Sequence, residues 1–138
     1  MSVTQYNELI NAASAARLLA YAPYSGFQAG AAALATKAGK TCTGCNVENV
    51  SLGLTICAER SAVATTIAQG RKDFVAIAVV TARKKPAIPR GACRQVLAEF
   101  NPNIKVPAAT VDGRVQEFDL AELLPFPAQG ILEGSRYV

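Results

Sequence analysis

Two cysteines and a glutamate stand at the predicted starts of two helices, where side chains and backbone donors can meet. Cys57 opens the run CAER, in which Glu59 is the third residue, and Cys93 ends the run PRGAC. A thiol at a helix N-terminus lies near the positive end of the helix dipole, which favours the thiolate and makes it a metal ligand or a nucleophile. Glu59 would lie in the first helical turn, close enough to a metal-bound water to move protons without ligating the metal. The pattern predicts proton transfer beside a metal site.

A third polar run, NVEN, ends a predicted strand and contains Asn46 and Glu48. Each run alone also has a structural explanation. Cys57 alone is typical of a small buried apolar residue, and Glu59 alone of a first-turn acid that the helix dipole favours. Asn46 and Glu48 alone are typical of turn and edge positions. The combination of these four residues favours a functional site.

The first half of the chain predicts two helices with a pair of strands between them. Residues 3–20 carry apolar side chains at three- and four-residue spacings, which predicts an amphipathic helix. Residues 28–36 and 40–48 flank the turn-like link at 37–39, so we expect paired antiparallel strands. Residues 55–69 are rich in Ala and apolar at helical spacing, which predicts the helix that Cys57 and Glu59 begin.

The second half predicts the centre of the sheet and two further helices. Residues 74–81 are almost continuously apolar, which indicates a strand buried on both faces. Residues 92–100 follow a Pro and a Gly and predict a third helix. A short strand at 105–110, a turn at 112–113 and a final helix at 120–124 complete the pattern.

Strands interleaved with helices in a chain of 138 residues predict a single domain over residues 1–138. Its expected fold class is α/β, a three-layer α/β/α sandwich around one mixed sheet. About half of the residues, 51%, are apolar, which is enough for a real core.

Composition argues against several classes of partner. The chain has 14 basic and 10 acidic residues, four Tyr, five Phe and no Trp, so it lacks the clustered basic and aromatic surface of a dedicated nucleic-acid binder. We expect no membrane insertion and no secretion signal, because no apolar stretch is long enough. We therefore expect a cytoplasmic protein whose four cysteines, Cys42, Cys45, Cys57 and Cys93, are reduced.

The runs TGCNVEN, TICAER and GACRQVL, with APYSGFQAGAAAL and ELLP, resemble the cytidine deaminase family in the right order over nearly the whole chain. They follow the general pattern of zinc deaminases, in which cysteines hold zinc and a nearby Glu shuttles protons. The resemblance implies a five-stranded sheet, one Zn²⁺ per chain, a homotetramer, and hydrolytic deamination of cytidine or deoxycytidine, a small pyrimidine nucleoside.

The resemblance also implies roles for individual residues. Cys57 and Cys93 are expected to ligate zinc. Glu59 is expected to deprotonate the zinc-bound water and to deliver the proton to N3 and the leaving ammonia. Arg60 is expected to donate hydrogen bonds to the thiolates. The expected substrate-binding residues are Phe27, Asn46, Glu48 and Ala58.

The sequence departs from the family motif Pro-Cys-Gly-x-Cys, because Arg90 stands where a zinc-ligating cysteine is expected. Two thiolates leave zinc one protein ligand short of the usual catalytic three, and a protonated guanidinium cannot ligate it. Strand geometry argues against Cys45 or Cys42 as the missing zinc ligand. The Cys45 side chain should point to the opposite face of the strand from Asn46, and Cys42 lies about 13 Å upstream of Asn46. The Arg90 guanidinium could itself occupy the position of the metal cation, pairing with a thiolate or with Glu59.

Three hypotheses therefore stay open. The first is a zinc-dependent cytidine deaminase. The second is a catalytically impaired nucleoside-binding homologue, which Arg90 motivates. The third is a deaminase that acts on a modified base or an aminonucleoside antibiotic. A further departure is Leu52, where the family often has a Tyr that contacts a neighbouring subunit. We interpret Arg94 as structural, and residues 83–85 as a solvated loop.

Overall fold

The computed structural model describes residues 1–35 and 40–128. Its strands form one mixed five-stranded sheet in the order β2-β1-β3-β4-β5. β1 pairs antiparallel with β2 and β3, β3 pairs parallel with β4, and β5 returns antiparallel to β4. The strands are β1 Ala29–Ala35, β2 Thr41–Cys45, β3 Phe74–Thr81, β4 Lys105–Thr110 and β5 Val115–Asp119. This arrangement confirms the predicted mixed sheet with residues 74–81 at its centre.

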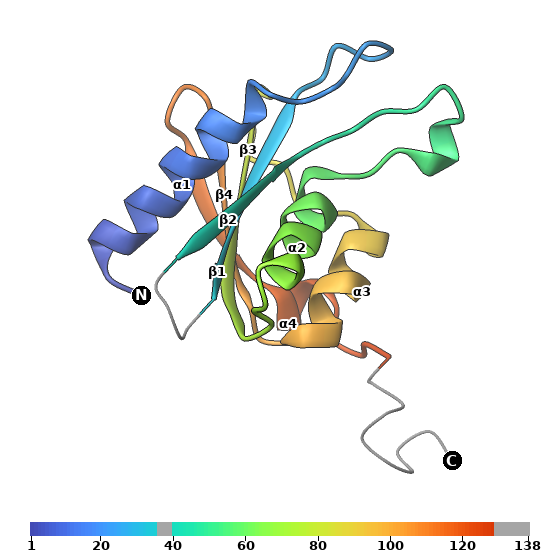
Figure 1. The fold of residues 1–138 in the computed structure, drawn as a ribbon. Helices are drawn as coiled ribbons and strands as arrows, with labels where there is room; N and C mark the ends of the chain where they lie inside the picture. The colour runs from blue at the N-terminus through green and yellow to red at the C-terminus, as the bar shows by residue number, and fades with distance from the viewer. Residues whose placement is uncertain (36–39, 129–138) are drawn as a thin grey trace.

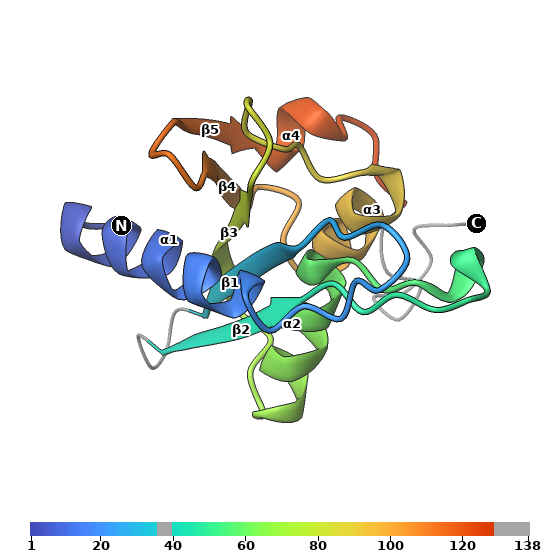
Figure 2. The ribbon, with the colours of Figure 1, turned by 90° about the horizontal axis from the view of Figure 1, so that it is seen from above.

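Helices cover both faces of the sheet (Figures 1 and 2). α1 lies on one face, and α2, α3 and α4 lie on the other. The helices are α1 Val3–Arg17, α2 Ala58–Ala68, α3 Gly91–Phe100 and α4 Leu120–Leu123, and a short 3₁₀ helix, η1, spans Leu52–Leu54. The three-layer α/β/α sandwich is therefore confirmed. No helix in the described part of the chain is long and apolar enough to cross a membrane.

The inner strand β1 has a buried side chain at every position and alternates between the two layers. Ala32 and Leu34 pack with Leu9 and Ala13 of α1, whereas Ala31 and its neighbours of the same parity pack with α2, α3 and α4. This alternation follows the two-residue period of a strand, and small side chains let helices approach from both sides.

Two glycines show how closely the helices approach the sheet. A Cβ at Gly30 would lie 2.0 Å from the Ala13 carbonyl oxygen of α1. A Cβ at Gly44 would lie 2.3 Å from the Ala62 nitrogen of α2. Both distances are far inside van der Waals contact, so only glycine fits at either position.

The elements differ from the predictions mainly at their ends. α1 ends at Arg17 rather than residue 20, and it begins with a capping box between Ser2 and Gln5. The segment from Thr55 to Cys57 is extended and not helical, so α2 begins three residues later than predicted. β2 ends at Cys45, beyond which Val47 pairs only in isolated bridges.

The residue patterns did not predict strand β5, and the predicted link at 37–39 lies outside the described residues. β5, which we did not predict, is exposed along its first three residues, so it lacks the apolar alternation that identifies a strand. The turn before it is confirmed, because Gly113 has a φ of 93°, which favours glycine.

Candidate active site

The starts of α2 and α3 bring two thiols together. Cys57 is the N-cap of α2, and Cys93 is the third residue of α3. Both thus stand at helix starts, as the sequence predicts. The Cys93 thiol donates a hydrogen bond to the Cys57 sulfur, which lowers the pKa of Cys57 to about 5. The same bond, together with burial, raises the pKa of Cys93. Near neutral pH, the Cys57 thiolate therefore accepts a hydrogen bond from the protonated Cys93 thiol.

Glu59 is a buried carboxyl in the first turn of α2, with 7% of its surface exposed. Burial raises the pKa of Glu59, and the negative Cys57 sulfur raises it further. A backbone hydrogen bond and the positive charge of Arg60 act in the opposite direction. A carboxyl whose pKa is raised by burial accepts a proton more readily than an exposed one, which suits a general acid and base.

Arg60 supports the loop that leads into α2. Its Nη2 donates to the Thr55 carbonyl oxygen at 3.0 Å and reaches the Cys57 sulfur at 3.8 Å. This contact agrees with the role predicted for Arg60. The guanidinium stabilises the Cys57 thiolate and contributes to lowering its pKa.

Asn46 and Glu48 both hold the segment that carries Phe27. The Asn46 side chain accepts from the Ala29 N–H at 2.8 Å and donates to the Phe27 carbonyl oxygen at 2.7 Å. Glu48 accepts from the N–H groups of Tyr24 and Ser25 at 2.9 and 3.1 Å.

The Ser25 hydroxyl also donates to Glu48 and holds the pKa of that carboxyl below its ordinary value. The sequence analysis missed these contacts. Their only signal is the turn APYSG, whose polar and N–H groups need partners.

These elements enclose a cavity of about 260 Å³. Of the predicted site residues, it is lined by Phe27, Asn46, Glu48, Cys57, Ala58, Glu59 and Arg90. Cys93 and Arg60 do not line it, and act behind its wall. The sequence analysis missed seven further lining residues, which come from β1 and β3, from the segment before α2 and from the β3–α3 connection: Ala29, Thr55, Val79, Thr81, Arg83, Ala87 and Ile88. The predicted residues are thus gathered around one hollow.

The ligand set for zinc is short of a donor. Arg90 is the N-cap of α3, and its charge lowers the pKa of Cys57. Within residues 1–35 and 40–128, no group of three His, Cys, Asp or Glu side chains could hold a metal ion. Cys42, which is buried, and Cys45, which is half-buried, are both free thiols on β2. The donors present do not complete the usual catalytic set of three.

Residues 3–109 match the family model described as the cytidine and deoxycytidylate deaminase zinc-binding region. The chain belongs to this family. It is 52% identical to a cytidine deaminase of Halalkalibacterium halodurans over 118 residues, which cover 85% of this chain and 89% of the relative. It is 41% identical to a cytidine deaminase of Mycobacterium tuberculosis over 125 residues, 91% of this chain and 90% of the relative.

The fold agrees with solved members of the family. The crystal structure of cytidine deaminase from Burkholderia pseudomallei superposes with a TM-score of 0.85 at 44% identity, covering 93% of this chain and all of that one. The matched region is a zinc-binding one, so Zn²⁺ is the cofactor that goes with this family. Arg90 therefore stands inside the region where the family binds its metal.

Proposed function

We propose that this chain hydrolyses the 4-amino group of cytidine or deoxycytidine, which gives the uridine product and ammonia. The observation that carries the proposal is the meeting of Cys57 and Glu59 at one cavity, which Asn46 and Glu48 also line and behind whose wall Cys93 lies. The identity of 52% to a relative named cytidine deaminase supports the same substrate class.

Glu59 is the residue that moves protons in this proposal. Its carboxylate takes a proton from the water that adds to C4 and passes it to N3 of the ring. In the second half of the reaction, Glu59 takes the proton of the new C4 hydroxyl and delivers it to the amino nitrogen as the bond from C4 to that nitrogen breaks, which leaves the C4 carbonyl and ammonia. The raised pKa of Glu59 suits both transfers, because burial makes the carboxylate a stronger proton acceptor than an exposed one.

Phe27, Ala58, Asn46 and Glu48 bind the nucleoside in this proposal. Phe27 packs beside the base, and the backbone of Ala58 hydrogen-bonds its edge. Each Glu48 oxygen can accept about two hydrogen bonds, and Oε2 receives only the Ser25 hydroxyl among the described residues, so it can accept a ribose hydroxyl too. The Asn46 amide retains one N–H for the same purpose.

Cys57 and Cys93 are the donors that this chain offers to the zinc of the family, and Arg90 takes the place of the third. Arg90 favours a second candidate function, in which the chain binds nucleosides with little or no turnover. A guanidinium beside a thiolate supplies positive charge without a site for water activation.

One paired measurement separates the two functions: zinc per chain by elemental mass spectrometry, and cytidine turnover by ultraviolet absorbance on the same sample. Close to one zinc with turnover supports the deaminase. No zinc and no turnover, with calorimetric binding of cytidine retained, supports the binding protein. Loss of binding as well contradicts both. The variant Cys57→Ser is the control, because it removes one of the two donors.

We also propose that the protein assembles as a homotetramer in the cytoplasm. An arm between β2 and α2 projects from the body of the molecule (Figures 1 and 2). It exposes Val50, Leu52 and Leu54 by 76%, 73% and 66%, which is typical of a surface that a partner covers. Light scattering is expected to give four times the chain mass, and Leu52→Asp is expected to lower the measured mass.

The four free thiols fit a reducing compartment, which supports the cytoplasmic location.

A further inference from the structure

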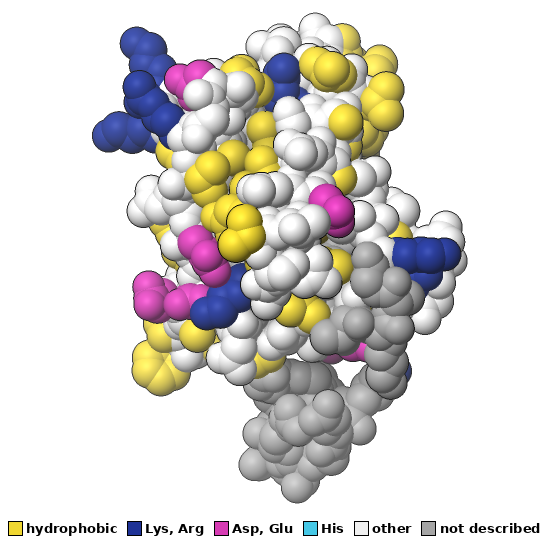
Figure 3. Space-filling view, turned by 90° about the vertical axis from the view of Figure 1, so that its left-hand side faces the viewer, with side chains coloured by type: hydrophobic (Ala, Val, Ile, Leu, Met, Phe, Trp, Pro, Cys, Tyr) yellow, Lys and Arg dark blue, Asp and Glu magenta, His cyan; other side chains and the backbone are white. Residues whose placement is uncertain are grey.

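A second hollow lies beside the site cavity, where the β3–α3 connection meets the start of α3. Its volume is about 640 Å³, and five of its lining residues are basic: Arg83, Lys84, Lys85, Arg90 and Arg94. No acidic residue lines it in the part of the chain that the structure describes. We refer to it as the basic pocket. Figure 3 shows Lys and Arg side chains that project together at one corner of the molecule.

One of these five cations is already committed to the fold. Arg94 donates from Nε to the Pro89 carbonyl oxygen at 2.7 Å and from Nη1 to the Leu123 carbonyl oxygen at 2.9 Å. These bonds tie α3 to the connection before it and to the end of α4, in agreement with the structural role predicted for Arg94. The other four cations are exposed, and none forms an ion pair with a described carboxylate.

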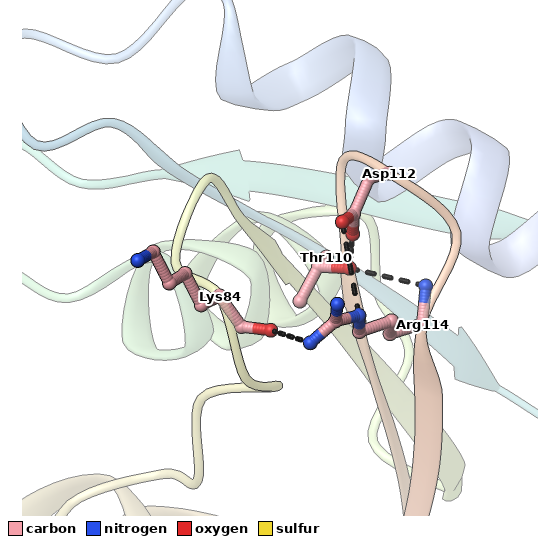
Figure 4. A network of polar contacts seen from close by, with 4 residues as sticks. All are labelled: Lys84, Thr110, Asp112 and Arg114. Atoms are coloured by element: carbon pink, nitrogen blue, oxygen red, sulfur yellow. Dashed lines mark hydrogen bonds and ion pairs between the residues drawn. The ribbon is translucent and has the colours of Figure 1, made fainter.

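A neighbouring turn holds the backbone of the pocket in place (Figure 4). Arg114 donates from Nη1 to the Lys84 carbonyl oxygen at 3.1 Å, and Asp112 lies 3.8 Å from the Arg114 Nε. Thr110 donates to Asp112 and accepts from the Arg114 N–H. Asp112 therefore balances Arg114, while the Lys84 ammonium points away from this network. The turn fixes the loop without neutralising the Lys84 charge.

The arrangement of the cations favours a small anion with several charges. A dedicated nucleic-acid surface is an extended basic stripe, whereas these side chains line a hollow. Unpaired like charges around a hollow raise its positive potential, and an anion with several charges gains from all of them at once. Guanidinium groups bind phosphate oxygens in pairs, and ammonium groups add compact positive charge. One water takes up about 30 Å³, so the pocket has room for two linked phosphate groups and their hydration water.

We propose that the basic pocket binds condensed inorganic phosphate, for which pyrophosphate is the probe. The proposal does not rest on the proposed function, because Lys84 and Lys85 line the basic pocket and not the site cavity. Arg83 and Arg90 line both hollows and form the wall between the anion and the site. The ligand needs neither a base nor a sugar, so the site cavity stays open to a nucleoside.

Calorimetric titration of the full chain tests the class of ligand. Pyrophosphate is expected to bind with a Kd below about 1 mM at low salt, and at least about tenfold more tightly than inorganic phosphate. Raising the salt from about 20 mM to about 200 mM is expected to weaken binding about tenfold, because the cations are exposed. Absence of binding would overturn the proposal, and so would equal affinities for the two anions.

A further titration separates the inorganic anion from the same group on a nucleotide. Adenosine 5′-diphosphate carries two linked phosphate groups, and it is expected to bind no more tightly than pyrophosphate. Tighter binding of the nucleotide would overturn the assignment to an inorganic ligand.

Charge-matched variants locate the anion. Lys84→Gln with Lys85→Gln is expected to weaken pyrophosphate binding by roughly threefold to tenfold. Lys40→Gln with Lys72→Gln removes the same charge at the opposite end of the sheet and is expected to leave the affinity unchanged. Equal effects of the two pairs would overturn the assignment to this pocket. Cys57→Ser is also expected to leave the affinity unchanged, and loss of binding in it would overturn the proposal by placing the anion on a metal. Cytidine turnover reports on the proposed function separately.

Discussion

The starts of α2 and α3 each present a cysteine to the same place, but their surroundings differ. At α2, the residues around Cys57 are those of the family motif, and Glu59 is buried beside it. At α3, Cys93 is equally placed in the first turn, yet its N-cap is the exposed Arg90. Arg90 also lines the basic pocket, of about 640 Å³, together with Arg83, Lys84, Lys85 and Arg94.

This difference separates two functions of a metal-dependent site. In the proposed function, the start of α2 provides the acid and base, which depends on burial and on a nearby thiolate. The start of α3 is expected to provide metal ligands, but Arg90 stands where one of them is expected. The comparison therefore predicts that proton transfer and substrate binding are retained more fully than metal binding. The following changes test one helix start against the other.

The largest effect is expected from Glu59→Gln, which keeps the shape of the α2 start and removes its proton carrier. Turnover of cytidine is expected to fall by about 10²- to 10⁴-fold. Glu59→Gln should be made both in the chain as it is and in the Arg90→Cys variant, and ultraviolet absorbance should follow cytidine turnover in each. Cytidine binding by the same samples is the control. Retained turnover in both backgrounds would contradict the role of Glu59.

A smaller loss is expected when α2 is displaced without touching its chemistry. In Gly44→Ala, the new Cβ meets the α2 backbone at 2.3 Å, so the helix must move. The free energy of unfolding is expected to fall by about 1–3 kcal/mol, as for other overpacked sites, and denaturant titration measures it. Gly53→Ala is the matched control, because its Cβ would meet nothing within 4 Å. Equal stabilities of the two variants would contradict the close seating of α2.

At the α3 start, Arg90→Cys is expected to restore the missing donor. Zinc per chain should rise toward one, and cytidine turnover should rise at least about tenfold. Arg90→Ser is the matched variant, since it removes the charge without adding a thiolate. A gain in both variants would show that the guanidinium blocks the site. A gain in neither would contradict the geometry proposed for Cys57 and Cys93.

The smallest effect concerns the two thiols themselves. Because the pKa of Cys57 is lowered to about 5, its thiolate predominates above that pH, whereas Cys93 stays protonated. In protein treated with a chelator, iodoacetamide at about pH 6 should label Cys57 and spare Cys93, which peptide mass spectrometry resolves. Arg60→Gln should shift the labelling of Cys57 to higher pH. Onset of Cys57 labelling only near pH 8.5, the range of a free thiol, would contradict the assignment.

Much of the fold could be predicted because the central elements follow strong patterns. The strand at 74–81 and the strand at 105–110 have the predicted bounds, since continuous apolar runs between turn signals leave little choice. β5 was missed because an exposed edge strand carries no such pattern. The start of α2 was placed three residues early because the Ala-rich spacing does not show where the N-cap lies.

The candidate site was predictable where the chemistry is local in sequence. Cys57 and Glu59 share one helical turn, so their proximity follows from the spacing alone. The walls that Arg83 and Ile88 supply were not predictable, because a loop between two elements has no periodicity. Residues 83–85 are exposed, as predicted for a solvated loop, but Arg83 also lines the cavity, which only the three-dimensional fold reveals.

The tight packing on β1 has a consequence for how this chain tolerates mutation. Every residue of Ala29–Ala35 is buried between helices on two sides, so a larger side chain at any of them meets neighbours that cannot retreat. In a library of random variants selected for folded protein, this seven-residue strand should be among the most depleted stretches of the chain. The exposed cations at 83–85 should vary freely in the same selection. Such a profile would separate what the chain needs in order to fold from what it needs in order to bind.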